Sequence, residues 1–340
     1  MTAMKTILIT GATGFLGKHL VEQLKSEGDT THLRVLCRGL SPWEQDAAVE
    51  VVHGDIINRE HVEHATEGVS EIYHLAGVVS RNAQDQDLLY QTHIEGTRNV
   101  CEAALKHKVE KVVAVSSSGT IAVGTTPAVH DETSGFKNDV VAEWPYYLSK
   151  IFAEKLALDY QARTGLNVVV ASPSLLLGIG DDRNSSTRDV ALFLQGEIKV
   201  MPKGGLNFVD VRDVAHGLTL AMRSGKPGER YLMGNVNWTF RQLIEKVAEI
   251  SGKKPPTMEP PFEVSLWGAR ALRVIYPLLG KKIELDEASV KMSACYWYCD
   301  STRARNELGF QTRDPEETLK ETVEDVHLRL YRSGQLHPSV

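Results

Sequence analysis

Several features that mark particular protein classes are scarce or missing in this sequence. Only four of its 340 residues are cysteine (Cys37, Cys101, Cys295 and Cys299), which is too few for a disulfide framework. The isolated pair Cys295 and Cys299 favours buried apolar thiols over a zinc site. No run of about eighteen apolar residues occurs, so no membrane-spanning helix is predicted, and the first ten residues do not resemble a secretion signal. We therefore expect a cytoplasmic protein with reduced thiols.

The sequence also has no excess of basic residues. Thirty-eight Lys and Arg side chains stand against forty-four Asp and Glu side chains, which gives a net charge of −6. A nucleic-acid-binding surface needs a basic stripe that neutralises phosphates, so we expect no nucleic-acid partner. Hydrophobic residues make up 42% of the chain and charged residues 24%, which is ordinary for a folded protein and excludes a disordered one.

Short apolar runs alternate with amphipathic segments in the first two-thirds of the chain. Six of these runs are predicted to form buried strands: Thr6–Thr10, Leu33–Cys37, Val49–His53, Glu71–Leu75, Val112–Ser116 and Asn167–Ser172. Helices are predicted between them at Gly14–Glu27, Arg59–Ala65, Asp85–Lys106 and Pro145–Arg163. Strands joined by crossover helices predict the α/β class, with a doubly wound parallel sheet of the Rossmann type.

This alternation ends after Ser172, which suggests a second unit. We expect residues 1–173 to form a dinucleotide-binding domain, with 207–234 packing back onto it, and 174–206 and 235–332 to form a smaller mixed α/β substrate lobe. Four more helices are predicted at Val211–Arg223, Thr239–Ser251, Pro261–Leu279 and Pro315–Tyr331. The helix Pro261–Leu279 is apolar over much of its surface. Core packing is the favoured interpretation, with a substrate lid or weak membrane contact as alternatives.

A glycine-rich turn joins the first predicted strand to the first predicted helix. Small residues there let the backbone approach a pyrophosphate, and the helix N-terminus offers N–H groups and a partial positive charge. The position of the turn between a strand and a helix favours dinucleotide binding over an ordinary turn. The predicted contacts are Gly11, Thr13, Gly14, Phe15, Leu16 and Gly17.

The end of the second strand indicates which dinucleotide is bound. An acidic residue there accepts hydrogen bonds from the 2′-hydroxyl of NAD, whereas an arginine suits the 2′-phosphate of NADP. The strand ends at Cys37 and is followed by Arg38, with no acidic residue before Glu44. We therefore predict NADP, with NAD as the less favoured alternative. Further cofactor contacts are predicted at the ends of later strands, at Asp55, Ile56, Leu75, Ala76, Gly77, Pro173 and Ser174.

A tyrosine and a lysine form the predicted catalytic pair. Tyr146 and Lys150 are four residues apart and share one face of a predicted helix. A nearby ammonium lowers the pKa of a phenol and makes it useful for proton transfer. A serine at the end of the fifth strand is predicted to hold a substrate carbonyl against Tyr146. We favour Ser118, because it lies farthest into the loop, and keep Ser117 as the alternative.

Together these motifs resemble the extended short-chain dehydrogenase/reductase superfamily, of the epimerase/dehydratase type. The motifs are Gly11-x-x-Gly14-x-x-Gly17, Asp55-Ile56, His74-Leu75-Ala76-Gly77, the serine turn and Tyr146-x-x-x-Lys150. The segments 207–215 and 300–305 resemble the branch of dihydroflavonol-4-reductase-like and 3β-hydroxysteroid-dehydrogenase-like proteins.

The resemblance implies roles for individual residues. Tyr146 would donate a proton, Lys150 would bind the nicotinamide ribose and tune Tyr146, and Ser118 would polarise the substrate carbonyl. A homodimer built on the helices Asp85–Lys106 and Pro145–Arg163 is also implied. His93 stands where the family often has asparagine.

Two departures from the superfamily's nucleotide-sugar enzymes favour a reductase. Gly119-Thr120 follows Ser118 where sugar dehydratases have an Asp-Glu pair, and Leu175 replaces the asparagine that helps to seat a sugar nucleotide. A leucine cannot form that hydrogen bond. We therefore predict an NADP(H)-dependent reductase that acts on a ketone or aldehyde of a medium-sized, partly apolar small molecule.

Two alternatives of different kinds remain. One is a nucleotide-sugar epimerase with tightly bound NAD, in which Arg183, Arg188 and Arg212 would serve a diphosphate. The other is a non-catalytic NADP-sensing protein, which would not need the catalytic residues. No metal site is predicted, because the pair His61 and His64 has no third ligand. The acidic pair Asp181-Asp182 is predicted either to close over substrate or to cap a turn.

Overall fold

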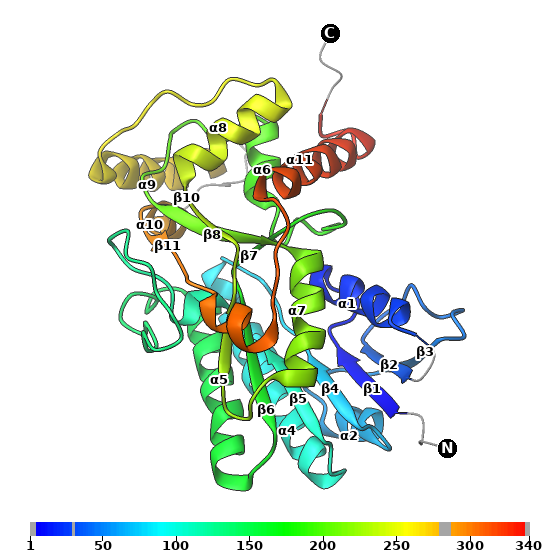
Figure 1. Cartoon of the computed structure of the whole chain (residues 1–340). Coiled ribbons are helices and arrows are strands. Elements are labelled where there is room, and N and C mark those ends of the chain that lie inside the picture. Colours follow the sequence, from blue (N-terminus) through cyan, green and yellow to red (C-terminus); the bar gives the residue numbers. More distant parts are fainter. Residues whose placement is uncertain (1–4, 29–30, 279–286, 337–340) are drawn as a thin grey trace.

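The computed structural model describes residues 5–28, 31–278 and 287–336 (Figure 1). Within these residues, seven parallel strands form the larger sheet, in the order β3-β2-β1-β4-β5-β6-β9. Their bounds are β1 Lys5–Thr10, β2 Thr31–Cys37, β3 Val49–His53, β4 Glu71–His74, β5 Lys111–Val115, β6 Val168–Pro173 and β9 Arg230–Met233. The strand order reverses between β1 and β4, where ligands of such sheets bind at the carboxyl ends.

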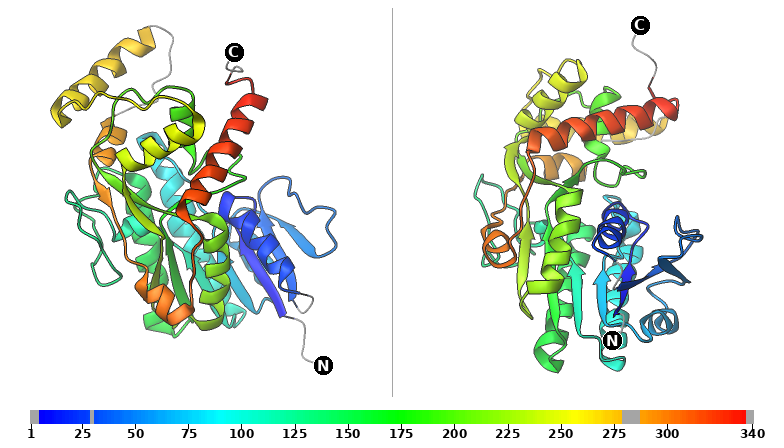
Figure 2. Two further views of the ribbon diagram at one scale, coloured as in Figure 1. Left: turned by 45° about the horizontal axis from the view of Figure 1, so that its top comes forward. Right: turned by 45° about the vertical axis from the view of Figure 1, so that its right-hand side comes forward.

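Helices cover both faces of this sheet (Figure 2). On one face lie α1 (Phe15–Ser26) and α7 (Val211–Ser224), which pack against each other. On the other face lie α2 (Arg59–Thr66), α4 (Gly96–Lys106) and α5 (Pro145–Thr164). Strand β6 is buried along its whole length, as expected for a strand between two helical layers. The predicted doubly wound α/β fold is therefore confirmed.

A smaller mixed sheet lies beyond the carboxyl ends of the parallel strands (Figure 1). Its central strand pairs in parallel with β7 and β11 and antiparallel with β10. The strands are β7 Leu175–Leu177, β8 Gly205–Asp210, β10 Val236–Thr239 and β11 Tyr296–Trp297, with β8 at the centre. The helices of this part are α6 Arg188–Leu194, α8 Phe240–Ser251, α9 Phe262–Leu278, α10 Glu287–Ser293 and α11 Pro315–Arg332. A core of apolar side chains from α6, α8 and α11 packs against the sheet.

Helix α9 corrects one expectation from the sequence. Phe262, Val264 and Trp267 are exposed on its outer face, with 66% of Trp267 accessible, whereas Leu266 and Ala269 are buried. Core packing therefore holds for one face only, because the helix lies at the edge of the smaller lobe (Figure 2). The predicted end of this helix, Leu279, lies outside the described residues. Among the helices described, none is long and apolar enough to cross a membrane.

Candidate active site

The glycine turn after β1 forms a backbone cradle at the N-terminus of α1. Gly11 has a φ of +74°, and a side chain there would come within 2.6 Å of the backbone nitrogen of Ala76. The N–H of Gly14 donates to the carbonyl of Gly11 over 3.0 Å, and Gly14 starts α1 without a side-chain cap. No capping side chain therefore accepts a hydrogen bond from the first N–H groups of α1. This arrangement fits a pyrophosphate group.

The other predicted residues of the turn differ in what they can offer a ligand. Phe15, Leu16 and Gly17 are buried, and the first two belong to the core between α1 and the sheet. Only their backbone groups can take part in binding. Thr13 and Gly14 are half-buried and lie at the surface of the turn.

A hydrogen-bond network around His74 holds the end of β4 beside this turn. The N–H of Ala76 donates to Thr10 Oγ1 over 3.2 Å, and Thr10 Oγ1 lies 2.8 Å from His74 Nδ1. His74 Nε2 reaches Thr97 Oγ1 at 3.1 Å. Burial and the nearby Lys150 lower the pKa of His74 to about 3, so the ring is neutral. The predicted segment Leu75–Gly77 is thereby brought against Gly11.

The ends of β2 and β3 lie side by side at the far end of the crevice. Arg38 is 62% exposed, and its Nη1 atom is 4.0 Å from Asp55 Oδ2. The other carboxylate oxygen of Asp55 accepts from the N–H of Ile57 over 3.2 Å. The next residue, Ile56, is buried. Arg38 thus has a long contact with one carboxylate and enough exposure to meet a phosphate.

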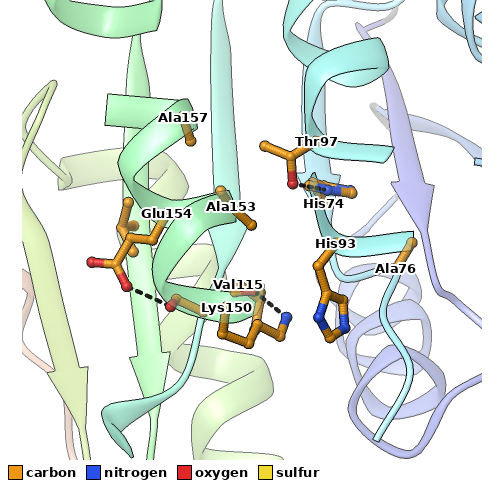
Figure 3. A pocket seen from close by; sticks show the side chains of 12 residues that line it. His74, Ala76, His93, Thr97, Val115, Lys150, Ala153, Glu154 and Ala157 are labelled. Atoms are coloured by element: carbon orange, nitrogen blue, oxygen red, sulfur yellow. Dashed lines mark hydrogen bonds between the residues drawn. The ribbon is translucent and has the colours of Figure 1, made fainter. Parts of the chain in front are cut away.

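Lys150 is buried behind the carboxyl end of β5. Its Nζ donates to the carbonyl of Val115 over 3.0 Å (Figure 3). Burial lowers the pKa of Lys150 to about 8, and the charge of Glu154, one turn later on α5, acts in the opposite direction. A cavity of about 20 Å³ lies beside the two side chains, large enough for about one water molecule.

Tyr146 lies in the first turn of α5, which begins at Pro145. Burial raises the pKa of its phenol, while a side-chain hydrogen bond with Ser117 acts to lower it. The pKa of Tyr146 is therefore raised and not lowered as the sequence predicts, because burial outweighs the other effects. The ammonium of Lys150 is directed at the Val115 carbonyl.

The three serines after β5 have different surroundings. Ser116 donates to the buried carboxylate of Glu154 over 2.5 Å, and Ser117 lies next to Tyr146. The extended backbone ends at Ser117, and Ser118 begins a 3-10 turn whose first carbonyl accepts from Ile121. The alternation expected from a continuing strand therefore fails at Ser118. The hydroxyl paired with Tyr146 is that of Ser117, the alternative candidate.

Two residues at the end of β6 are predicted to contact the cofactor, Pro173 in the strand and Ser174 directly after it. Pro173 is the last residue of the strand, and the N–H of Ser174 donates to the carbonyl of Met233 over 3.0 Å. Both residues are buried. The hydroxyl of Ser174 has no hydrogen-bond partner within the described chain, so it is available to a ligand.

An aromatic wall that the sequence did not reveal stands next to Tyr146. Tyr147 stacks on Trp297 of the smaller sheet, with ring centroids 4.7 Å apart, and Trp144 lies against both rings. Gly119 allows this packing, because a side chain there would overlap the ring of Tyr147. No local pattern joins Trp297 to the catalytic helix, so only the fold brings them together.

Near this aromatic wall, a bidentate ion pair connects the loop after β4 to helix α6. Arg81, in the loop after β4, donates to both carboxylate oxygens of Asp189 on α6, over 3.1 and 3.0 Å. The charges of both residues act on the pKa of Tyr147, so the pair lies near the aromatic wall. Paired donors of this kind fix both partners in orientation.

Three other predicted groups have structural partners. Asp181 accepts hydrogen bonds from three residues of the following turn, Ser185, Ser186 and Thr187, so it caps a turn. Arg212 is paired with Asp210 and Glu321, which leaves it poorly suited to bind a diphosphate. His61 accepts from the N–H of Asp55 over 3.1 Å. In the part of the chain that the structure describes, no three His, Cys, Asp or Glu side chains gather as metal ligands.

The comparison with known families agrees with this geometry. The model described as "NAD dependent epimerase/dehydratase family" matches residues 7–234, a span that contains the glycine turn, the serine turn and the pair Tyr146 and Lys150. The chain belongs to this family. The resemblance to the extended short-chain dehydrogenase/reductase superfamily is thereby confirmed.

Individual proteins are similar to this chain over most of its length. A Synechocystis sp. protein with the provisional name dihydroflavonol 4-reductase is 31% identical, over 94% of this chain and 92% of its own length. Cinnamoyl-CoA reductase 1 of Oryza sativa subsp. japonica is 30% identical over 74% of this chain and 77% of its own. The crystal structure of gox2253 superposes with a TM-score of 0.82 at 27% identity, covering 98% of this chain and all of that one.

Proposed function

We propose that this protein is an NADP(H)-dependent reductase that converts a ketone or aldehyde of a medium-sized, partly apolar molecule to the alcohol. The observation that carries the proposal is the group of half-buried Tyr146 and Ser117 and buried Lys150 at the carboxyl ends of the parallel strands. The relatives named as reductases support it. A bound nicotinamide would supply the hydride.

In this proposal each residue of the group has a separate task. Ser117 and the phenol of Tyr146 would both hydrogen-bond the substrate carbonyl, and Tyr146 would protonate its oxygen. Because burial raises the pKa of Tyr146, the phenol keeps its proton at neutral pH and can act as the acid. Lys150, held by Val115, would bind the ribose of the cofactor.

The shape of the proposed substrate follows from the surroundings of Tyr146. The stacked rings of Tyr147 and Trp297 border it on one side, and they suit an apolar molecule. The paired Arg81 and Asp189 already satisfy each other's charges, which supports a neutral substrate over a charged one.

The proposal favours NADP over NAD because of Arg38. Its exposed guanidinium follows β2, where the adenosine ribose would lie in this fold. The nucleotide-sugar epimerase with tightly bound NAD is less well supported, since Arg212 is committed to Asp210 and Glu321 and Leu175 offers no hydrogen bond.

We also propose a homodimer built on α4, α5 and the neighbouring short helix α3 (Gln86–Tyr90). Phe152 on α5 is 43% exposed and lies 6.2 Å, between ring centroids, from Tyr90 at the end of α3. Leu88 on α3 is exposed as well. Apolar side chains gathered on one surface are typical of an interface.

Replacing Tyr146 with phenylalanine tests the proposed reaction. With NADPH and a panel of aliphatic and aromatic ketones and aldehydes, Tyr146→Phe should lower kcat about 10²- to 10⁴-fold, because the general acid is lost. The affinity for NADPH should be retained. Tyr160→Phe, on the same helix but bonded to Glu102, is the matched control. Unchanged turnover by Tyr146→Phe would overturn the assignment.

A further inference from the structure

His93 occupies an unusual place in the helix that leads into the site. A π-helical turn, Gln91–Glu95, separates α3 from α4, and His93 is its middle residue. Such wide turns are rare and often occur at functional sites. The side chain of His93 is 1% exposed and points from this turn toward the amine of Lys150 (Figure 3).

The hydrogen bonds of His93 have a defined direction. The N–H of Val78 can only donate, so it fixes His93 Nε2, 3.0 Å away, as the acceptor. His93 Nδ1 must then carry the proton of the neutral ring and donate to Ser149 Oγ over 2.7 Å. Ser149 Oγ in turn donates to the carbonyl of Tyr146 over 2.8 Å. A continuous chain therefore runs from the loop after β4 to the first turn of α5.

Both ends of this chain lie at the proposed site. A side chain at Gly77 would come 3.1 Å from His93 Nε2 and 3.4 Å from Lys150 Nζ, so the loop, the imidazole and the ammonium are close neighbours. The ring of His93 also meets the ring of Tyr146 edge to face, with centroids 5.8 Å apart. Burial and the charge of Lys150 lower the pKa of His93 to about 2, which keeps the ring neutral and its hydrogen bonds unchanged at ordinary pH.

We propose that His93 is a positioning residue with two separable tasks. Through Nε2 it holds Val78 and the loop against which the bound cofactor lies, and through Nδ1 and Ser149 it fixes the turn that carries Tyr146. The proposal rests on the proposed function for the role of Tyr146. It predicts that the loop bond affects cofactor affinity and the helix bond affects the chemical step.

Two substitutions at one position can separate these tasks. The amide of asparagine reaches about as far as imidazole Nδ1, and that of glutamine about as far as Nε2. His93→Asn should therefore keep the bond to Ser149 and lose the bond to Val78, whereas His93→Gln should do the reverse. Ser149→Ala removes only the hydrogen bonds that connect His93 to the first turn of α5. His64→Gln, on an exposed side chain of α2, is the control.

The expected results differ between the variants. His93→Asn should raise the Kd for NADPH about three- to tenfold, as for one lost hydrogen bond, and leave kcat within about twofold. His93→Gln and Ser149→Ala should lower kcat at least about tenfold, because Tyr146 is displaced, with the Kd unchanged. Equal defects in the two His93 variants would overturn the proposal. The proposal would also be overturned if these variants lowered the melting temperature and left both the Kd and kcat unchanged.

A measurement without turnover keeps this proposal distinct from the proposed function. Long-range ¹H–¹⁵N NMR of the histidine rings should assign the Nδ1–H tautomer to His93 and show no titration of this ring between about pH 5 and 8. An Nε2–H tautomer, or titration of His93 in that range, would contradict the arrangement. If wild-type protein binds NADPH but reduces no carbonyl compound, the proposed function fails, and the NMR and Kd results still decide the roles of His93.

Discussion

At the scale of single residues, the serine turn shows how a shift of one position changes which hydroxyl we propose for catalysis. Ser117 and Ser118 are chemically identical, and they differ because the backbone leaves the extended conformation between them. We expect Ser117→Ala to lower kcat for carbonyl reduction about 10²-fold, since one donor to the developing charge is lost. Ser118→Ala, the matched control, should have a much smaller effect. Steady-state kinetics decides between them, and a larger loss in Ser118→Ala would restore the first assignment.

Arg38 allows a second test at this scale, because its role depends on one group of the cofactor. A charge-assisted hydrogen bond to the 2′-phosphate exists only with NADP(H). Arg38→Ala should therefore raise the Kd for NADPH about tenfold or more and leave the Kd for NADH unchanged. Fluorescence titration measures both constants, with Arg59→Ala, an exposed arginine of α2 paired with Glu102, as the control. Tightly retained NAD in freshly purified protein would contradict the NADP assignment.

At the scale of secondary-structure elements, those that form because of their own local sequence could be predicted, and those that form because of distant partners could not. The first six parallel strands could be predicted because each is a short, mostly apolar run, and the pair Tyr146 and Lys150 because its spacing places both on one face of α5. Strand β11 has only two residues and exists because it pairs with Gly205 and Leu206, far away in the sequence. The aromatic wall depends on that pairing, so local patterns cannot reveal it.

Helix α5 also carries a buried charge that tunes its neighbour. Glu154 accepts from Ser116 and Thr120 and is paired with Arg230 of β9, and its charge raises the pKa of Lys150 against the effect of burial. These contacts hold the Glu154 carboxylate in place one helical turn after Lys150, where its charge favours the protonated amine.

Removing this charge should move the pH profile of the enzyme. In Glu154→Gln the pKa of Lys150 should fall below about 8, so the ammonium is lost at lower pH and the alkaline limb of kcat/KM shifts to lower pH. Glu102→Gln, a carboxylate of α4 outside the site, should leave the profile unchanged. A profile of Glu154→Gln that coincides with that of the wild type would show that Glu154 does not act on Lys150.

At the scale of the whole molecule, the two buried neutral histidines tie the stability of the fold to pH. Burial lowers the pKa values of His74 and His93 to about 3 and about 2, whereas in the unfolded chain each is about 6.5. Below pH 6.5 the unfolded state therefore binds more protons than the folded state. The stabilisation is complete above this pH and is lost as the pH falls toward the folded values.

The size of this effect can be measured by urea unfolding at a series of pH values. Each histidine should contribute about 1.4 kcal/mol per pH unit to the fall in unfolding free energy between about pH 5.5 and 4. His93→Asn should remove one such contribution from the slope even if it lowers stability at pH 7, because asparagine does not titrate. His64→Gln, at an exposed position of α2, is the matched control. An unchanged slope in His93→Asn would mean that His93 is protonated in the folded protein, which the hydrogen bond from Val78 does not permit.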